Sequence, residues 1–476
     1  MLFKLAYFII YVCMKQGAER AARAVFEREL KEIKPTKQEL EESVYSINKL
    51  TSALKKVVPK DVEIRVVGSV VRGTQLRGES DIDVFLLFPK KYKRERITKE
   101  GLDYAKRIVK EKGDTYEVKY AEHPYTRLYL SSLGVKADIV PAFNIDNIED
   151  MSTAVDRSPM HADFINKHLS ERQRDEVRLL KYLLKRQNLY GAEIMTSGFS
   201  GYLCELLIYK YGTLSGLLES AANFTLPILL DPKGKAELHD KSLVKRFNSQ
   251  FIVIDPVDRD RNVAAGVSLE TLGKFVMMSR AFTAKPRVDF FRGRSFKHGA
   301  VQRQLESFIR ESGLDMYAIA TKVPDKSEDI VWPQLRKVTE FIAAYAEKLG
   351  FRIYFSIPIV LGRDGYLVFF APKEALKTRM QKGPSVFMRK AQEAFAKAHA
   401  GAVAMPMRGD AIYALEKNKY VDVEHLIRDV AAGRVLGKRK DITLRGSRLF
   451  INGLPKGCGE TVYADILESF GMGSGG

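Results

Sequence analysis

Residues Val66–Phe88 read VVGSVVRGTQLRGESDIDVFLLF, and this stretch carries the strongest local signal in the chain. A strand-like apolar run leads into Gly68-Ser69, where the missing Cβ lets backbone amides approach a phosphate. The Ser69 hydroxyl can add a donor at the start of the next helix. Asp81 and Asp83 lie two apart on a second strand, so both carboxylates point to one face. The stretch predicts a phosphate cradle beside two acids that can share a metal ion.

A third acid, Asp138, lies inside another apolar strand in the segment KADIVPAF. Because an unpaired carboxylate is costly to bury there, a partner must be supplied. If the two strands are neighbours, the three acids converge on a site suited to Mg²⁺. Two metal ions roughly 3.5–4 Å apart could then support an in-line phosphoryl displacement. Each feature alone also fits a common turn, a solvated strand end or a salt-bridged core residue, but their order and spacing favour the metal site.

The pattern around this stretch predicts a multi-domain α+β protein. Apolar residues at helical spacing predict two helices over Lys15–Val58, broken at Pro35. Alternating and apolar runs then predict strands, a hairpin that turns at Gly134, a helical region, and finally helices mixed with short strands. The corresponding residues are Glu63–Val67, Asp81–Phe88 and Arg127–Val140 for strands, Glu171–Tyr211 for helices, then the helix Trp332–Leu349 and the strands Ile353–Pro358 and Gly365–Phe370.

Composition limits the class of protein. The chain has 476 residues, of which 45% are hydrophobic and 29% charged, so it can form about three domains of roughly 100–200 residues each. A net charge of +19 favours a polyanionic partner, although excess lysine can also serve solubility alone. The three cysteines, Cys13, Cys204 and Cys458, lie far apart and indicate neither a disulfide framework nor a zinc site, which fits a reducing cytoplasm.

The two ends differ from the rest of the chain. The apolar run Leu2–Cys13 is too short to span a bilayer, which takes about 20 residues, so no stable membrane association is expected. An appended strand or helix, or an upstream start, is the simplest explanation, with a signal peptide or interfacial anchor as the alternative. The closing residues 471–476, GMGSGG, predict a flexible tail.

The motifs resemble those of a known superfamily. The order G-S, G-T, S-D-I-D-V and then a later Asp in a strand resembles the DNA polymerase beta-like nucleotidyltransferases. Further segments are similar, in the same order, to those of the archaeal-type (class I) CCA-adding enzymes, from Met14 to about Leu467. These segments are TAVDRSPMH (Thr153–His161), RLLKYLLKRQNLYG (Arg178–Gly191), SGFSGYLCELLI (Ser197–Ile208), VIDPVDRDRNVAAGVS (Val253–Ser268) and DIVWPQL (Asp329–Leu335).

The resemblance implies roles for individual residues. Three carboxylates hold the metal in this family, and they fall on Asp81, Asp83 and Asp138; many relatives have Glu at the first position, and Asp is a shorter ligand of equal charge. Ser69 and Arg72 would contact nucleotide phosphates. The remaining implied contacts are to the triphosphate from His161, Lys181 and Tyr190, and to the incoming base from Arg261.

Structural alternatives stay open for several of these residues. His161 could be a satisfied structural histidine, and Lys181 could lie on a solvated helix face. Lys181 and Tyr190 share a helix face only if the helix continues past Asn188. Arg261 could simply pair with Asp258 in a turn.

The resemblance also implies an activity and a domain order. The activity would be addition of C, C and A to the 3′ end of tRNA from CTP and ATP, without a nucleic-acid template. The alternatives are a poly(A) polymerase or oligoadenylate synthetase, an inactive RNA-binding protein of the same fold and, more distantly, a small-molecule nucleotidyltransferase. The oligomeric state is left open, with a homodimer as one option. The expected parts are an extra apolar segment 1–13, a catalytic head 14–154 with a mixed sheet, a helical central domain 155–285 and α/β C-terminal RNA-binding domains 286–470.

The C-terminal part carries basic runs with interleaved aromatic residues. These runs suit a surface that follows an RNA backbone, although any one of them could be a solvated helix. They are Lys285–Lys297, Arg379–Lys390 and Arg434–Arg448.

Overall fold

A computed structural model of the chain describes residues 2–79, 81–109, 113–120, 124–131, 133–193, 195–234, 242–292, 299–326, 328–435, 444, 446–455, 458 and 460–470. The chain divides into two compact units, residues 1–293 and 294–476. The first unit holds all the residues singled out for chemistry.

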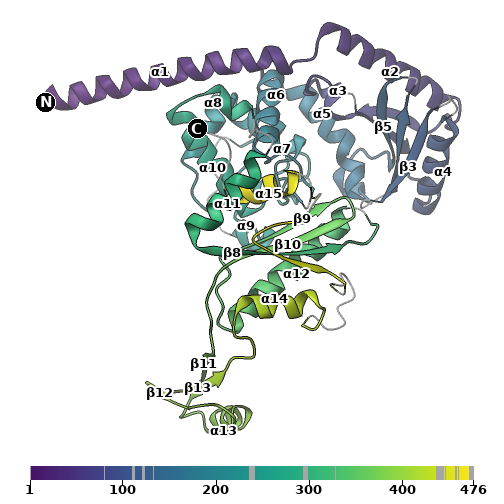
Figure 1. Cartoon of the computed structure of the whole chain (residues 1–476). Coiled ribbons are helices and arrows are strands. Elements are labelled where there is room, and N and C mark those ends of the chain that lie inside the picture. The colour runs from purple at the N-terminus through teal and green to yellow at the C-terminus, as the bar shows by residue number, and fades with distance from the viewer. Residues whose placement is uncertain are drawn as a thin grey trace. The chain divides into compact units, whose positions relative to one another are not determined.

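The first unit contains a five-stranded sheet, which follows α1 and α2 in the chain (Figure 1). Its strands lie in the order β1-β2-β5-β4-β3. β2 and β5 are parallel, while the other neighbours are antiparallel. The strands are β1 (Glu63–Val67), β2 (Ile82–Phe88), β3 (Thr115–Tyr120), β4 (Pro124–Leu130) and β5 (Val135–Phe143).

The alternation of side chains along β2 and β5 gives this sheet two apolar faces. Val84, Leu86 and Ile139 face a core that α2 (Lys37–Lys55) and α4 (Arg94–Arg107) cover. Phe85 and Val140 face a second core, which α5 (Ser158–His168) and η2 (Ala154–Arg157) cover. Asp83 and Asp138 have the same parity as this second set, so the strand pattern directs them toward the α5 face.

The rest of the first unit is mainly helical and shares one large apolar core. Its centre is α6, whose residues Leu179, Leu180, Leu183 and Leu184 are all buried. The elements are α1 (Leu2–Ile33), the short α3 (Gly68–Arg72) between β1 and β2, η1 (Ile148–Asp150), α6 (Glu171–Arg186), α7 (Gly201–Tyr211), α8 (Leu214–Ala222), β6 (Ile228–Leu230), α9 (Ser242–Phe247), β7 (Phe251–Val253), α10 (Leu269–Ala284) and η3 (Val288–Phe291).

The second unit contains a sheet with helices on both faces. The sheet has the order β14-β8-β10-β9, with α12 and α14 on one face and α11 and α15 on the other. A smaller sheet, β11-β13-β12, packs against α13. The elements are α11 (Ala300–Ser312), β8 (Leu314–Lys322), α12 (Glu328–Lys348), β9 (Phe355–Leu361), β10 (Asp364–Pro372), β11 (Thr378–Ser385), α13 (Arg389–Ala398), β12 (Met407–Arg408), β13 (Ala411–Lys417), α14 (Val423–Ala431), β14 (Arg448–Ile451) and α15 (Glu460–Ser469).

The structure confirms the α+β class and the main elements expected from the sequence. The two N-terminal helices end and begin on either side of Pro35, and the β4–β5 hairpin turns at Gly134 with φ +64°. The segment Leu2–Cys13 belongs to α1, and no helix in the described part of the chain is long and apolar enough to cross a membrane. Cys204 and Cys458 are free thiols.

Some expectations fall partly or wholly outside the described residues. Residues 471–476 lie outside them, as do parts of the basic runs 285–297 and 434–448. The division into head, central and C-terminal domains stays a prediction.

The packing of α4 on β5 yields a test of stability. A Cβ added to Gly101 in α4 would lie 2.6 Å from the Cβ of Pro141, whereas a Cβ at Gly273 in α10 would meet nothing within 4 Å. We expect Gly101→Ala to lower the free energy of unfolding by about 1–3 kcal/mol because of this overlap. Gly273→Ala should leave it unchanged or raise it by up to about 1 kcal/mol, through helix propensity alone. Urea unfolding of both variants measures the difference, and equal effects would contradict the close packing.

Candidate active site

Asp83 and Asp138 lie opposite each other on neighbouring parallel strands. The register of β2 and β5 pairs the two residues directly. Both therefore present their carboxylates on the face that α5 covers. Asp81 lies one residue before β2 and is exposed. The sheet thus brings two of the three predicted ligands side by side, and the third lies just before the start of β2.

The electrostatics around Asp83 call for a cation. Burial, followed by repulsion from Asp138, raises the pKa of Asp83 to about 6, and Asp81 adds to the repulsion. Arg72 and Arg127 act in the opposite direction. A carboxylate held in this way gains stability from a nearby positive charge, so the donor set fits a divalent metal ion.

Asp138 already has a partner. Arg127 lies opposite it in the antiparallel register of β4 and β5, and donates from Nε and Nη2 to the two carboxylate oxygens at 2.7 Å each. Within the described residues, no three His, Cys, Asp or Glu side chains form a group that could hold a metal ion as it stands. The convergence of Asp81, Asp83 and Asp138 on one metal therefore stays a prediction.

Gly68 is required where the chain passes Asp83. Gly68 begins α3 with φ +86°, a conformation that residues with a Cβ rarely adopt. A Cβ built there would overlap the Oδ2 atom of Asp83. The glycine thus lets the backbone at the start of α3 pass close to the Asp83 carboxylate. The predicted approach of this backbone and of Ser69 to a phosphate stays a prediction.

Arg72 and Lys181 meet around a buried carboxylate, Glu205. Arg72 Nε and the Thr74 hydroxyl both donate to Oε1 of Glu205, at 2.9 and 2.7 Å. Lys181 Nζ in turn donates to the Thr74 carbonyl and hydroxyl oxygens at 3.1 and 3.2 Å. Lys181 is only 2% exposed, and burial lowers the pKa of its ammonium, against the opposing effect of Glu205. The alternative that Lys181 lies on a solvated helix face is wrong, because α6 turns this residue toward the loop that follows α3.

Tyr190 does not lie on the helix that carries Lys181. α6 ends at Arg186, and Asn188 has φ +54°, which no α-helix accommodates. The two side chains nevertheless lie close together, because a Cβ at Gly201 would be 3.1 Å from the Tyr190 hydroxyl and 3.6 Å from Lys181 Nζ. A reversal of the chain, and not a shared helix face, brings them together.

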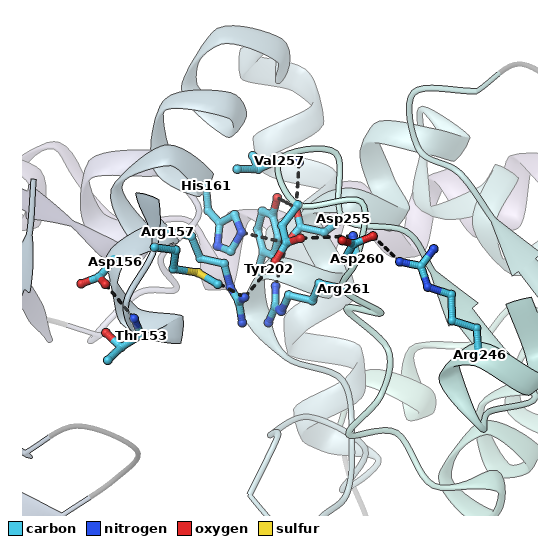
Figure 2. A network of polar contacts seen from close by, with 12 residues as sticks. Thr153, Asp156, Arg157, His161, Tyr202, Arg246, Asp255, Val257, Asp260 and Arg261 are labelled. Carbon is cyan, nitrogen blue, oxygen red and sulfur yellow. Dashed lines mark hydrogen bonds and ion pairs between the residues drawn. The ribbon is translucent and has the colours of Figure 1, made fainter. Parts of the chain in front are cut away.

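A second buried carboxylate, Asp255, gathers His161 and Arg261 (Figure 2). His161 Nε2 lies 2.8 Å from Oδ2, and Arg261 Nη1 lies 2.9 Å from the same oxygen. The Tyr202 hydroxyl donates to Oδ1 at 3.1 Å, and its ring stacks on His161 with centroids 4.1 Å apart. Although burial alone would raise it, the pKa of Asp255 is held well below its usual range by His161 and the other donors. Asp255 is therefore an anion that only accepts, so His161 must donate through Nε2.

One alternative paired Arg261 with Asp258, but the Arg261 guanidinium does not form that ion pair. Its partner is Asp255, while Asp258 accepts from Arg157 Nη1 at 3.0 Å. Burial and the charge of Arg261 lower the pKa of Arg157, so the two guanidinium groups lie near each other. His161 is buried and hydrogen-bonded, as expected of a structural histidine, and it also lies beside Arg261 in the same network.

Several residues that hold this site were not singled out from the sequence: Arg127, Glu205, Asp255, Tyr202 and Arg157. The hairpin predicted at Gly134 could have identified Arg127, because the hairpin register places that residue opposite Asp138. Asp255 and Glu205 follow or interrupt apolar runs, which is a sign of a buried acid that needs a partner. The other partners of these acids come from distant parts of the chain, His161 and Tyr202 for Asp255 and Arg72 and Thr74 for Glu205, so no spacing in the sequence names them.

The comparisons with known proteins agree with this geometry. The model of a nucleotidyltransferase domain matches residues 47–168, which include β1, β2 and β5. The chain is accordingly a nucleotidyltransferase, an enzyme of the transferase class. The models of the second domain of tRNA nucleotidyltransferase and of the C-terminal domain of the CCA-adding enzyme match residues 175–292 and 312–447.

Curated relatives narrow the assignment. CCA-adding enzymes from Methanocaldococcus jannaschii and Archaeoglobus fulgidus are 34% and 33% identical to this chain, over 85% and 86% of it and 90% and 91% of their own length. The CCA-adding enzyme of Pyrococcus abyssi is 34% identical over 75% of this chain and 79% of its own. The chain belongs to the CCA-adding enzyme family. Among solved structures, the Cid1 poly(U) polymerase aligns with 57% of this chain and 98% of its own at 16% identity, with a TM-score of 0.47.

The contact between Gly68 and Asp83 can be tested by adding one methyl group. We expect Gly68→Ala to reduce nucleotidyl transfer at least about 100-fold, because Asp83 must move away from the added Cβ. Gly78→Ala is the matched control: Gly78 has φ +76°, yet a Cβ there meets nothing within 4 Å. Both variants carry the cost of a left-handed backbone, about 1–2 kcal/mol, but only the first displaces a carboxylate. Equal transfer rates for the two variants would show that the close approach is unimportant.

Proposed function

We propose that the protein is a cytoplasmic CCA tRNA nucleotidyltransferase that adds C, C and A to the 3′ end of tRNA from CTP and ATP, without a nucleic-acid template. The observation that carries the proposal is the direct pairing of Asp83 with Asp138 on one face of the sheet, beside the glycine that starts α3. Membership of the CCA-adding enzyme family supports the substrate, since the relatives are named for this addition.

The proposed reaction is an in-line attack of the 3′ hydroxyl on the α-phosphate, with release of pyrophosphate. Asp81, Asp83 and Asp138 would hold Mg²⁺. Asp83 fits this role because burial and repulsion from Asp138 destabilise its charged carboxylate, which a bound cation would stabilise. Bound magnesium, in a two-metal arrangement, would lower the pKa of the attacking hydroxyl and neutralise charge on the leaving pyrophosphate. Arg127 supports Asp138 by fixing the orientation of both its oxygens.

Cations and hydroxyls around these acids would bind the nucleotide. Ser69 and Arg72 belong to α3, whose first residue contacts Asp83, so a phosphate near the acids would lie within their reach. The other proposed contacts are to the triphosphate from His161, Lys181 and Tyr190, and to the base from Arg261. Lys181 donates to Thr74 in this structure, and it would have to exchange that contact to reach a phosphate directly.

The C-terminal part, residues 286–470, would bind the body of the tRNA, with the head (14–154) and the central domain (155–285) holding its end and the nucleotide. The run Arg379–Lys390 extends from β11 to the start of α13. Phe387, between these two elements, is 87% exposed, and its sequence neighbours Lys382, Arg389 and Lys390 are exposed as well. An exposed aromatic ring among cations suits RNA, which combines phosphates with stacking bases. The net charge of +19 agrees with this partner.

Product analysis tests the proposal. The protein is incubated with tRNA that lacks its last three nucleotides, with each nucleoside triphosphate alone and in combination, with and without Mg²⁺. We expect two C and one A to be added, and no addition without the metal. A long A tail would instead indicate a poly(A) polymerase, and an absence of any product would leave an RNA-binding protein.

The metal assignment can be tested separately. Asp83→Asn should reduce incorporation at least about 1000-fold, because it removes a carboxylate from the reacting centre, while tRNA binding persists. Asp150→Asn is the control, since within the part of the chain that the structure describes the Asp150 side chain forms only a surface ion pair, with Lys90. Primer-extension gels report incorporation, and filter binding reports tRNA affinity. Full activity of Asp83→Asn would remove Asp83 from the metal site.

A further inference from the structure

We infer that Asp255 is a positioning residue that sets which nucleotides the enzyme accepts, because it fixes the direction of the Arg261 guanidinium. The inference rests on the proposed function, in which Arg261 contacts the incoming base. Asp255 itself would touch neither the nucleotide nor the metal.

Asp255 is built into the protein as a fixed point. Its side chain is 0% exposed, and its two oxygens accept hydrogen bonds from four donors. The donors come from three parts of the chain: His161 of α5, Tyr202 of α7, and both Val257 N–H and Arg261 of the loop after β7. A carboxylate has about four acceptor sites, so all of them are used. A fully satisfied buried group of this kind holds one geometry.

Arg261 is the outermost member of the network. Its side chain is 30% exposed, against 0% for Asp255 and 10% for His161. Among the described residues the guanidinium of Arg261 donates only through Nη1, to Asp255, so its Nη2 and Nε donors have no described partner. Asp255 therefore anchors one end of a guanidinium that is partly exposed, and its remaining donors are available to a ligand.

A second guanidinium makes this anchor necessary. Arg157 lies beside Arg261 (Figure 2), and the two like charges repel. Each is tied to its own carboxylate, Arg157 to Asp258 at 3.0 Å and Arg261 to Asp255 at 2.9 Å. Without the charge of Asp255, Arg261 would have no described anionic partner and would still be repelled by Arg157. Its side chain would then be free to take other directions.

The direction matters because a guanidinium only donates. Cytosine and adenine each present a ring nitrogen acceptor next to their amino group, N3 and N1 respectively, whereas uracil and guanine carry an N–H at the corresponding position. A donor held in a fixed direction can hydrogen-bond to the ring nitrogen of cytosine or adenine. With uracil or guanine it would face another N–H donor, and no hydrogen bond could form. A site built to hydrogen-bond its substrate strongly rejects an analogue that lacks the matching group, because the polar group of the site is then left unpaired. Anchoring Arg261 is thus a means to select C and A together.

The test measures nucleotide preference in Asp255→Asn, with Asp258→Asn as the matched control. Both variants remove one negative charge from a carboxylate that pairs with an arginine, but only Asp255 accepts a hydrogen bond from the Arg261 guanidinium. The kcat/KM values for CTP and UTP are measured on tRNA lacking its last three nucleotides, and those for ATP and GTP on tRNA ending in CC. We expect Asp255→Asn to lower the CTP/UTP and ATP/GTP ratios at least about 10-fold, the effect of one charged hydrogen bond. Asp258→Asn should keep both ratios within about 2-fold of wild type.

A double-variant cycle shows whether Asp255 acts through Arg261. If it does, Asp255→Asn should change the nucleotide ratios no further in an Arg261→Ala background. Full additivity of the two changes, or wild-type ratios in Asp255→Asn, would overturn the inference. Thermal unfolding and tRNA binding are measured for each variant. Should Asp255→Asn fail to fold, Asp255→Glu retains the charge but displaces Arg261, and lowered ratios are again expected; unchanged ratios would overturn the inference.

The two levels of the assignment fail in different ways. If wild-type protein adds no C or A to tRNA, the proposed function is wrong and the ratios cannot be formed. If the wild type prefers CTP and ATP, and the Asp255 variants keep that preference, the proposed function stands and the role of Asp255 is wrong.

Discussion

The placement of Asp83 directly opposite Asp138 is the constraint on which the rest of the first unit depends. Two carboxylates on adjacent strands repel each other, and burial of Asp83 makes that repulsion costly. The surrounding chain answers with specific features. Gly68 gives Asp83 room, Arg127 takes both oxygens of Asp138, and Arg72 lowers the remaining negative potential. Two adjacent acids that repel each other do not stabilise the sheet, so their presence points to chemistry and not to stability.

The elements that carry these residues follow from local patterns in the sequence. Alternation along β2 and β5 fixes which face receives Asp83 and Asp138, and Gly134 turns the hairpin that sets Arg127 opposite Asp138. These features were predictable because each depends on residues close together in the chain. The sequence predicted a shared site only on the condition that β2 and β5 are neighbours. The structure confirms that they are, and that they pair in parallel.

Other parts of the site were beyond the reach of sequence patterns. The end of α6 at Arg186 separates Tyr190 from the helix of Lys181, and a left-handed Asn188 is a weak signal for that break. One alternative paired Arg261 with its neighbour in the turn, Asp258, but the guanidinium donates instead to Asp255, whose shell His161 and Tyr202 complete. The burial of Lys181 depends on Thr74, more than a hundred residues earlier in the chain. For the shell of Asp255 and the burial of Lys181, contacts distant in sequence override the local expectation.

The charges of this protein divide into two kinds with different physical roles. Around the site, four arginines are each tied to one carboxylate: Arg72 to Glu205, Arg127 to Asp138, Arg157 to Asp258 and Arg261 to Asp255. Such pairs add little long-range field, because each cation is neutralised locally, but they hold donors in fixed directions. The excess that gives the chain its net charge of +19 must come from cations elsewhere, such as the exposed residues of β11 and α13. Those cations are screened by salt and attract any polyanion, so they can supply affinity for RNA but little discrimination. The paired arginines are better suited to discrimination, because their carboxylate partners hold them in fixed directions.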